Sequence, residues 1–464
     1  MVSTSQVERR VGRTLLVLSG APFLAGLDLF VVNVAFTAIG RDFTGHTLAD
    51  LSWILNGYPI IYAALLVPCG RWADRVGHKR VFLLGLALFT LASAAAAASP
   101  SLAALIGCRL VQAAGAAALT PTSLGLLIHA VPAEQRARSV RIWASIGALA
   151  SALGPVVGGF LVELSWRWVF LINVPIGIAL LVLGIRVIRD YRAEDTEPEV
   201  DVVGAVLLTV GIGALALALV EGSAWGWTSA GIITSLAVAV AALIAFAANN
   251  WRHRSPIIPP SLLKVRTFAW STIAVTFFSA TFGAGLLSRV FWLQDVWGYS
   301  AIQTGLAIAP GPLMVPVFAM AGQAMTRRVS TGVIAATGCL LWAAGTVYML
   351  LAVGPEPHYF TEMLPAWLIT GMGVGLAMPT MLSSATAELP PARSGTGSAV
   401  VNMARQVGTV FGIALLVAIL GSPTGYAEQH RAFTNVFWMV TVIGVVAAVA
   451  SLGLTQRRKA RLAA

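Results

Sequence analysis

The sequence predicts an all-α protein that crosses a membrane many times, and three observations support this fold class. Hydrophobic residues make up 58% of the 464 residues and charged residues only 11%, which is too apolar for an ordinary water-soluble domain. Apolar runs of about 20 residues, the length that crosses the hydrocarbon core of a bilayer, recur along the chain. The runs lack the alternating pattern of a membrane β-strand, so each is expected to form a helix.

Fourteen such runs are expected to be membrane spans. They are 14–39, 49–69, 81–99, 102–131, 139–162, 168–188, 202–220, 229–250, 269–293, 301–325, 331–353, 362–382, 397–420 and 434–455. A bundle of six, an inserted pair and a second bundle of six give three expected parts, 1–188, 189–250 and 251–464. The acidic segment 189–201 is either a linker between the first bundle and the inserted pair or a solvated loop.

Lysine and arginine show which way the chain crosses the membrane. Most of the 30 basic residues lie in the terminal segments and in every second loop, whereas Arg41, Arg167, Arg289 and Arg431 lie toward the other side. Cytoplasmic loops carry the excess of basic residues, so both termini are expected in the cytoplasm and the protein in the inner (cytoplasmic) membrane. The basic residues are scattered between apolar stretches, so the net charge of +11 does not indicate nucleic-acid binding.

The first expected span carries a carboxylate near its middle. The segment GLDLFVVNVAF places Asp28 there, with Asn33 about one and a half turns further on. A charged side chain at the centre of a bilayer costs roughly 2.5–3.5 kcal/mol, so Asp28 must face a cavity or a partner. Asp28 is therefore expected either to carry a proton or bind a cation, or to be locked in a structural pair. The fourth span, CRLVQAAGAA, places Arg109 and Gln112 on one helix face, and Arg109 needs a partner as well.

The loop after the second span reads GRWADRVGHKR and contains Gly70, Asp74, Gly77, Lys79 and Arg80. Its glycines permit a tight turn between two helices. Asp74 can pair with a cation or a helix N-terminus in one conformation and release it in another. A plain topological anchor is the alternative, because the basic residues alone would serve that purpose.

The fifth span contains the segment ALGPVVGGF, with Gly154, Pro155, Gly158 and Gly159. Glycines at this spacing let two helices approach closely, and a proline inside a helix removes a backbone donor and favours a kink. A simple packing seam of small residues is the alternative.

Together these segments resemble the major facilitator superfamily, and within it the fourteen-span drug/proton antiporters. The loop 70–80 is similar to the signature loop of the superfamily, with departures at Trp72 and His78. Further similar segments are SWRWVFLINVPIG at 165–177, LVEGSAWGW at 219–227, WLQDVWGYSAIQTGLAIAPGPL at 292–313 and PARSGTGSAVVNMARQVGTVFGIAL at 391–415. Departures at Phe30 and Thr37 bear on the substrate more than on the fold.

The resemblance implies two six-helix bundles with two inserted helices, and a carrier that works by alternating access. It implies that the loop 70–80 is a cytoplasmic gate latch, and that Arg109 lines the cavity with Asp28 as its counter-ion and takes part in proton transfer. The GPxxGG segment is typical of exporters in this superfamily. The expected function is thus proton-coupled efflux of drugs or antibiotics, with protons, the lipid bilayer and an amphipathic or cationic small molecule as partners.

Other functions are alternatives to this one. An uptake symporter of the same fold should lack GPxxGG, and a metabolite exporter or a non-transporting sensor is also open. No cofactor, metal site or enzymatic activity is expected, because the six histidines are dispersed and the sequence has no HExxH or GK[ST] motif. Arg289 is a charge in a span where none is expected. It either recognises an anionic or polar substrate group or extends to the outer surface, and the second interpretation is favoured.

Overall fold

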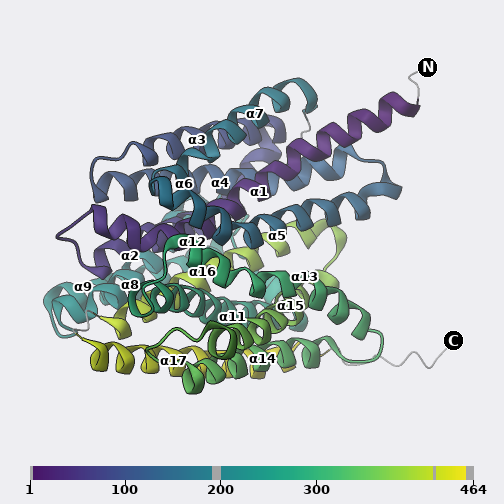
Figure 1. The fold of residues 1–464 in the computed structure, drawn as a ribbon. Coiled ribbons are helices and arrows are strands. Elements are labelled where there is room, and N and C mark those ends of the chain that lie inside the picture. Colours follow the sequence, from purple (N-terminus) through teal and green to yellow (C-terminus); the bar gives the residue numbers. More distant parts are fainter. Residues whose placement is uncertain (1–3, 191–199, 422–424, 456–464) are drawn as a thin grey trace. The chain divides into compact units, whose positions relative to one another are not determined.

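The computed structural model describes residues 4–190, 200–421 and 425–455, and every regular element in these ranges is a helix (Figure 1). The all-α prediction is therefore confirmed. The α-helices are α1 (Thr4–Asp42), α2 (Leu48–Val76), α3 (His78–Ala97), α4 (Leu102–Ala130), α5 (Ala133–Leu164), α6 (Trp168–Leu171), α7 (Asn173–Val187), α8 (Val202–Trp225), α9 (Ala230–Arg252), α10 (Pro260–Leu263), α11 (Arg266–Phe291), α12 (Ala301–Ile308), α13 (Pro310–Met325), α14 (Thr331–Ala352), α15 (Leu364–Ala387), α16 (Pro391–Leu420) and α17 (Tyr426–Leu452). The π-helical turns η1 (Trp292–Val296) and η2 (Tyr359–Met363) adjoin α11 and α15.

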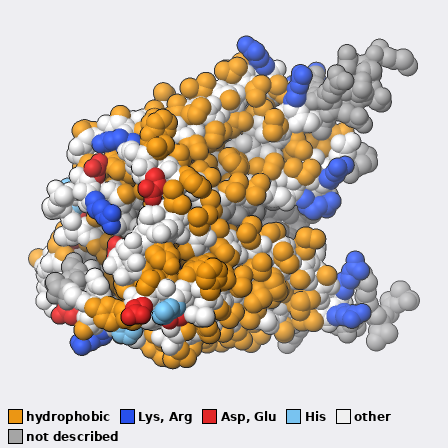
Figure 2. All heavy atoms as spheres, viewed as in Figure 1, with side chains coloured by type: hydrophobic (Ala, Val, Ile, Leu, Met, Phe, Trp, Pro, Cys, Tyr) orange, Lys and Arg blue, Asp and Glu red, His pale blue; other side chains and the backbone are white. Residues whose placement is uncertain are grey.

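Within the described ranges, 13 helical segments are long and apolar enough to cross a membrane. The remaining expected span, 139–162, lies inside the continuous helix α5, whose described apolar stretch is Leu153–Leu164. The chain is therefore a multi-pass membrane protein. On the face shown in Figure 2, hydrophobic side chains cover the middle of the helices, and the charged side chains lie toward helix ends. This is the distribution that a surrounding bilayer requires.

Two expected spans are divided by short breaks, each near a proline. The span 168–188 consists of α6 and α7 with Ile172 between them, and the span 301–325 consists of α12 and α13 with Ala309 between them. Pro175 and Pro310 lack the N–H that would bond to the carbonyl four residues earlier, so the helical hydrogen bonds stop just before each. The break before α7 matters for function, because it sets the position of Asn173.

The contacts between helices group the chain into two compact units. The first comprises residues 1–257 and 293–309, and the second comprises 258–292 and 310–464. In the first unit α1 packs along α5, α3 along α4, and α2 along both α4 and α8. In the second unit α11 packs along α16 and α17, and α14 along α15 and α17. The division expected from the sequence, 1–188, 189–250 and 251–464, stays a proposal about transport modules.

The inserted helices α8 and α9 are attached to the first unit. Asp201, only 1% exposed, caps α8 by accepting from the backbone N–H of Gly204 (2.7 Å), and it also accepts from the Asn249 side chain on α9 (2.9 Å). Arg71 on α2 donates to the backbone carbonyls of Ser255 and Pro256, just after α9. The acidic segment expected to link α7 to α8 lies at 191–199, outside the described residues.

Candidate functional site

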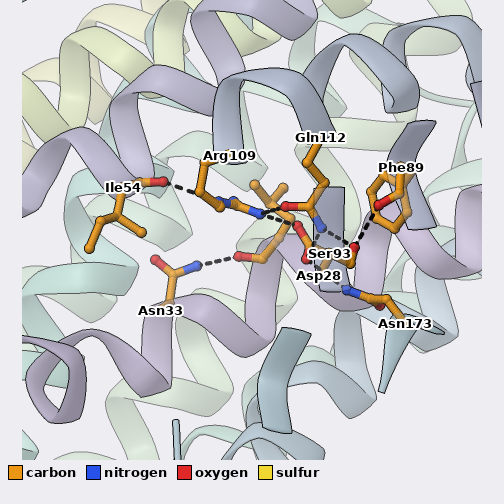
Figure 3. A network of polar contacts seen from close by, with 9 residues as sticks. Asp28, Asn33, Ile54, Phe89, Ser93, Arg109, Gln112 and Asn173 are labelled. Atoms are coloured by element: carbon orange, nitrogen blue, oxygen red, sulfur yellow. Dashed lines mark hydrogen bonds and ion pairs between the residues drawn. The ribbon is translucent and has the colours of Figure 1, made fainter. Parts of the chain in front are cut away.

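A closed polar network surrounds Asp28 in the first unit (Figure 3). Asp28 on α1 is 1% exposed, and three side chains donate to its carboxylate. Arg109 Nη1 donates to Oδ2 (2.5 Å), and Gln112 Nε2 and Asn173 Nδ2 both donate to Oδ1 (2.8 and 2.9 Å). The network therefore places a buried carboxylate in direct contact with a buried cation, as a charge inside a membrane requires.

Arg109 is held from several sides. Its Nη1 donates to Gln112 Oε1 (2.6 Å) and its Nε to the backbone carbonyl of Ile54 (3.4 Å). The guanidinium carbon lies 4.3 Å from the centre of the Tyr58 ring and 5.8 Å from that of Phe170. A cation over an aromatic face gains up to about 2 kcal/mol when it is desolvated. Contacts other than the ion pair therefore also hold the arginine beside Asp28.

Close helix packing brings the rest of the network together. A Cβ on Gly115 of α4 would lie 2.7 Å from the backbone nitrogen of Phe89 on α3, so these two helices can touch only because glycine stands there. This approach lets Gln112 Nε2 reach Ser93 Oγ (2.8 Å), which in turn donates to the carbonyl of Phe89 (2.8 Å). The hydrogen-bonding side chains of this one site therefore come from four helices, α1, α3, α4 and α7.

Asn33 is the predicted site residue that does not join this network. Its side chain donates to the carbonyl of Leu29 in its own helix (2.7 Å), and Figure 3 shows it apart from the cluster around Asp28. The expectation that it would act beside Asp28 rested on its distance along the helix, but five residues of α-helix turn the side chain to a different face.

The loop expected at 70–80 is a much tighter connection. α2 continues through Gly70 and Asp74 to Val76, and α3 begins at His78, so Gly77 alone separates the two helices. Gly77 has φ 113°, a conformation that other residues rarely adopt, which supports the predicted turn at this glycine. Gly70 does not form the turn. It lies inside α2, where its Cβ position is 3.5 Å from Pro121, an ordinary packing contact.

The sequence suggested that Asp74 pairs with a cation or with a helix N-terminus, and in the structure two aspartates, Asp74 and Asp190, make these contacts. Asp74 Oδ1 lies 2.8 Å from His78 Nε2, one turn further along the chain. The carboxylate at the start of α3 is instead that of Asp190, just after α7, which accepts from the backbone N–H of Lys79 (3.1 Å) and lies 4.0 Å from Arg80 Nε. Lys79 Nζ donates to the carbonyl of Ile185 (2.9 Å). The turn is therefore tied to the end of α7.

The glycines of α5 sit at two close helix contacts. Added Cβ atoms on Gly154 and Gly158 would lie 2.5 Å from Phe30 Cβ and 3.1 Å from Val31 Cα on α1, in the turn that follows Asp28. One on Gly159 would lie 2.6 Å from the carbonyl oxygen of Ala301 at the start of α12. Real Cβ atoms essentially never approach to 2.5 or 2.6 Å, and 3.1 Å is a tight contact, so larger side chains would push these helices apart. The close approach predicted for this segment is present.

The carbonyl of Pro155 belongs to the second of these contacts, because Gly305 on α12 packs against it. A Cβ on Gly305 would lie 2.3 Å from that oxygen. The sequence alone does not single out Gly305. Its segment, SAIQTGLAIAPG, belongs to a longer resemblance, and a lone glycine in an apolar run carries no signal of what faces it.

Asn173 and Ser93 were also missed by sequence reasoning. Each is an uncharged polar residue in an apolar run, and such residues often satisfy themselves on the backbone of their own helix. For Asn173 the available signal was its position two residues before Pro175, because the helix breaks at Ile172 and α7 begins with this amide. Asp190 was hidden by its position in a charged segment.

Comparisons with known proteins agree with this architecture. The sequence profile of the Major Facilitator Superfamily matches residues 18–413 and 317–463. The chain is 32% identical over 444 residues to the methylenomycin A resistance protein of Streptomyces coelicolor, covering 95% of this chain and 92% of that protein. It is 35% identical over 417 residues to the cephamycin export protein of Amycolatopsis lactamdurans, covering 89% and 85%.

Among solved structures, a peptide transporter of the POT family with a thioalcohol-conjugated peptide superposes with a TM-score of 0.70 over 97% of both chains, at 17% identity. At this identity the superposition bears on the fold alone.

Proposed function

The chain belongs to the Major Facilitator Superfamily and is therefore a transporter and not an enzyme, and we propose that it exports small organic compounds. In this proposal the compounds cross the cytoplasmic membrane in exchange for protons. The observation that carries the coupling is the contact between Asp28 and Arg109, both 1% exposed. The carboxylate of Asp28 is the group in this network whose charge a proton would cancel. Arg109, Gln112 and Asn173 then act as the groups whose contacts change when it gains or loses that proton.

Protonation of Asp28 from the outside removes the negative charge that Arg109 faces. The ion pair weakens, and the donors on α4 and α7 are released from the carboxylate, which favours the conformation that discharges substrate. Loss of the proton toward the cytoplasm restores the pair and the inward-facing state that loads again. In this proposal the proton gradient drives export because protonated Asp28 favours the conformation that releases substrate and deprotonated Asp28 favours the conformation that loads it.

Export rather than uptake is supported by the relatives and by α5. Proteins 32% and 35% identical to this chain are named for antibiotic resistance and antibiotic export, and the GPxxGG segment packs α5 against α1 and α12 through Gly154, Gly158 and Gly159. We propose that these contacts, with Pro155, hold the export conformation. The substrate is proposed to be an amphipathic or cationic drug or antibiotic, and both termini are proposed to lie in the cytoplasm.

The turn between α2 and α3 is proposed to be the cytoplasmic gate. Gly77 makes the turn, Asp74 holds the start of α3 through His78, and Asp190 holds it from α7. Lys79 and Arg80 add contacts to the same end of α7, while Gly70 is a packing position in α2. Movement of α7 would therefore change the contacts at the start of α3.

The test uses inside-out vesicles with an imposed proton gradient and a panel of cationic dyes and antibiotics. Wild type should accumulate at least one compound, and Asp28→Asn should not, although it inserts into the membrane at the wild-type level. Arg327→Gln, which changes an exposed arginine, is the matched control and should behave as wild type. Gradient-driven accumulation by Asp28→Asn at the wild-type rate would refute coupling through this carboxylate.

A further inference from the structure

Arg289 is a second buried arginine, and it lies in the second unit on α11. It is 0% exposed, and the span that contains it continues for seven residues to Val296, about 10 Å at roughly 1.5 Å per residue. A side chain that extends to the surface would be exposed at its tip, so the favoured sequence interpretation of Arg289 is wrong. The guanidinium is enclosed by protein inside the membrane.

Aromatic rings enclose this guanidinium. Its central carbon lies 4.8 Å from the centre of the Trp342 ring on α14 and 5.3 Å from that of Trp367 on α15. Trp342 is itself fixed, because its Nε1 donates to Thr281 Oγ1 (2.9 Å). α14 and α15 form a rigid support, since a Cβ on Gly338 would lie 2.6 Å from the backbone nitrogen of Ala377. The position of the charge is therefore set before any ligand arrives.

The hydrogen bonds of Arg289 leave part of its donor capacity unused. Nη1 donates to the carbonyl of Gly285 (2.9 Å) and Nη2 to Thr346 Oγ1 (3.0 Å), both neutral acceptors. Among the residues that the structure describes, Nε has no hydrogen-bond partner, although it is buried. Trp367 Nε1 is likewise buried, and no described residue bonds to it. Two buried N–H donors on side chains in contact make this spot rich in donors and short of acceptors.

The charge of Arg289 is also unbalanced. In the described part of the chain, no aspartate or glutamate forms an ion pair with it. Arg109, equally buried and also stacked on an aromatic ring, has Asp28 at 2.5 Å. A buried cation without an anion is costly, and aromatic faces offset only part of the cost. The counter-charge of Arg289 is therefore missing from its own surroundings.

We propose that Arg289, flanked by Trp342 and Trp367, binds the carboxylate of the exported molecule, with an adjacent planar or apolar group against the indole rings. The inference rests on the proposed export function and narrows its substrate class to amphipathic organic acids. A carboxylate suits the site because it accepts in a bidentate manner from the edge of a guanidinium. The site is closed in this conformation, so the ligand enters in another state of the transport cycle.

The test measures equilibrium binding of dansylglycine and of its methyl ester to the full-length protein in lipid nanodiscs, by the rise in dansyl emission. The two probes differ only in the carboxylate. Wild type should bind the acid at least about tenfold more tightly than the ester, which corresponds to roughly 1.4 kcal/mol. Arg289→Met should bind acid and ester equally, Arg289→Lys should keep part of the preference, and the control Arg327→Met should keep all of it.

Three outcomes would overturn the proposal. Wild type could bind the two probes with equal affinity, or it could bind neither measurably. The preference for the acid could also disappear completely when chloride replaces gluconate as the buffer anion. The last result would assign the site to an inorganic anion. If Arg289 had only a structural role, Arg289→Met would be less stable than wild type, and wild type itself would show no preference for the acid over the ester. Because no gradient is applied, the outcome is independent of the vesicle assay with Asp28→Asn, so failure of the export proposal and failure of this one are distinguishable.

Discussion

Replacing Asp28 by asparagine and Arg109 by glutamine, singly and together, measures how strongly the two side chains depend on each other. Asp28→Asn leaves the guanidinium with Gln112, the carbonyl of Ile54 and the ring of Tyr58, but without an anion. Removal of one partner of a buried ion pair costs about 3–5 kcal/mol, because the other charge stays buried and uncompensated. Asp28→Asn should therefore lower the free energy of unfolding by about that amount.

Arg109→Gln should cost less. Asp28 keeps two side-chain donors, at 2.8 and 2.9 Å, and it can also take up a proton and become neutral, which an arginine cannot do at accessible pH. The double variant carries two neutral amides that can bond to each other and leaves no buried charge. Its destabilisation should therefore be smaller than the sum of the two single effects by about 2–3 kcal/mol, the upper range for residues in direct contact.

The assay is equilibrium unfolding in mixed micelles, followed by helical circular dichroism and repeated for all four proteins of the cycle. Asp28→Asn combined with Arg327→Gln is the control, because an exposed arginine should show no coupling to Asp28. Additivity of Asp28→Asn and Arg109→Gln within about 0.5 kcal/mol would refute the reasoning, since independent sites behave in that way. The proposal that this ion pair changes between states of transport would then lose its energetic basis.

Further predictions concern the gate and the α5–α12 contact. Asp74→Asn should slow turnover with little change in substrate affinity, and the dependence of initial uptake rate on substrate concentration measures both; an unchanged rate would count against a latch. Asp190→Asn should cost about 0.3–1 kcal/mol of unfolding free energy in the micelle assay, because it removes the charge at the start of α3; no loss would argue against that contact. Gly159→Ala and Gly305→Ala should each destabilise by about 1–3 kcal/mol, whereas Gly213→Ala, with open space at its Cβ, should not; equal effects in all three would remove the steric argument.

The spans could be predicted from the sequence because each depends on local composition. A run of about 20 apolar residues must form a helix in lipid whatever surrounds it, and each expected span has a helix in the structure. The partnership of Asp28 and Arg109 was predictable for a related reason. Charges placed in two apolar spans must find each other or another partner, and the family resemblance named the pair.

The other members of the network depended on tertiary packing. Asn173 reaches Asp28 because the helix breaks before α7, and Gln112 reaches Ser93 because glycine lets α3 and α4 touch. The direction of Asn33 and the depth of Arg289 depend on how each helix is rotated about its own axis. Such rotation is set by contacts between helices, so it cannot be predicted from the residues of one span alone.

Thus the sequence by itself determined where the chain crosses the membrane and which charges needed partners, since both follow from the cost of polar groups in hydrocarbon. The tertiary structure alone decided which neutral residues complete the site around Asp28. It also decided that indole rings enclose Arg289 and that no carboxylate of the described residues pairs with it, because only packing determines which side chains from distant spans lie next to each other.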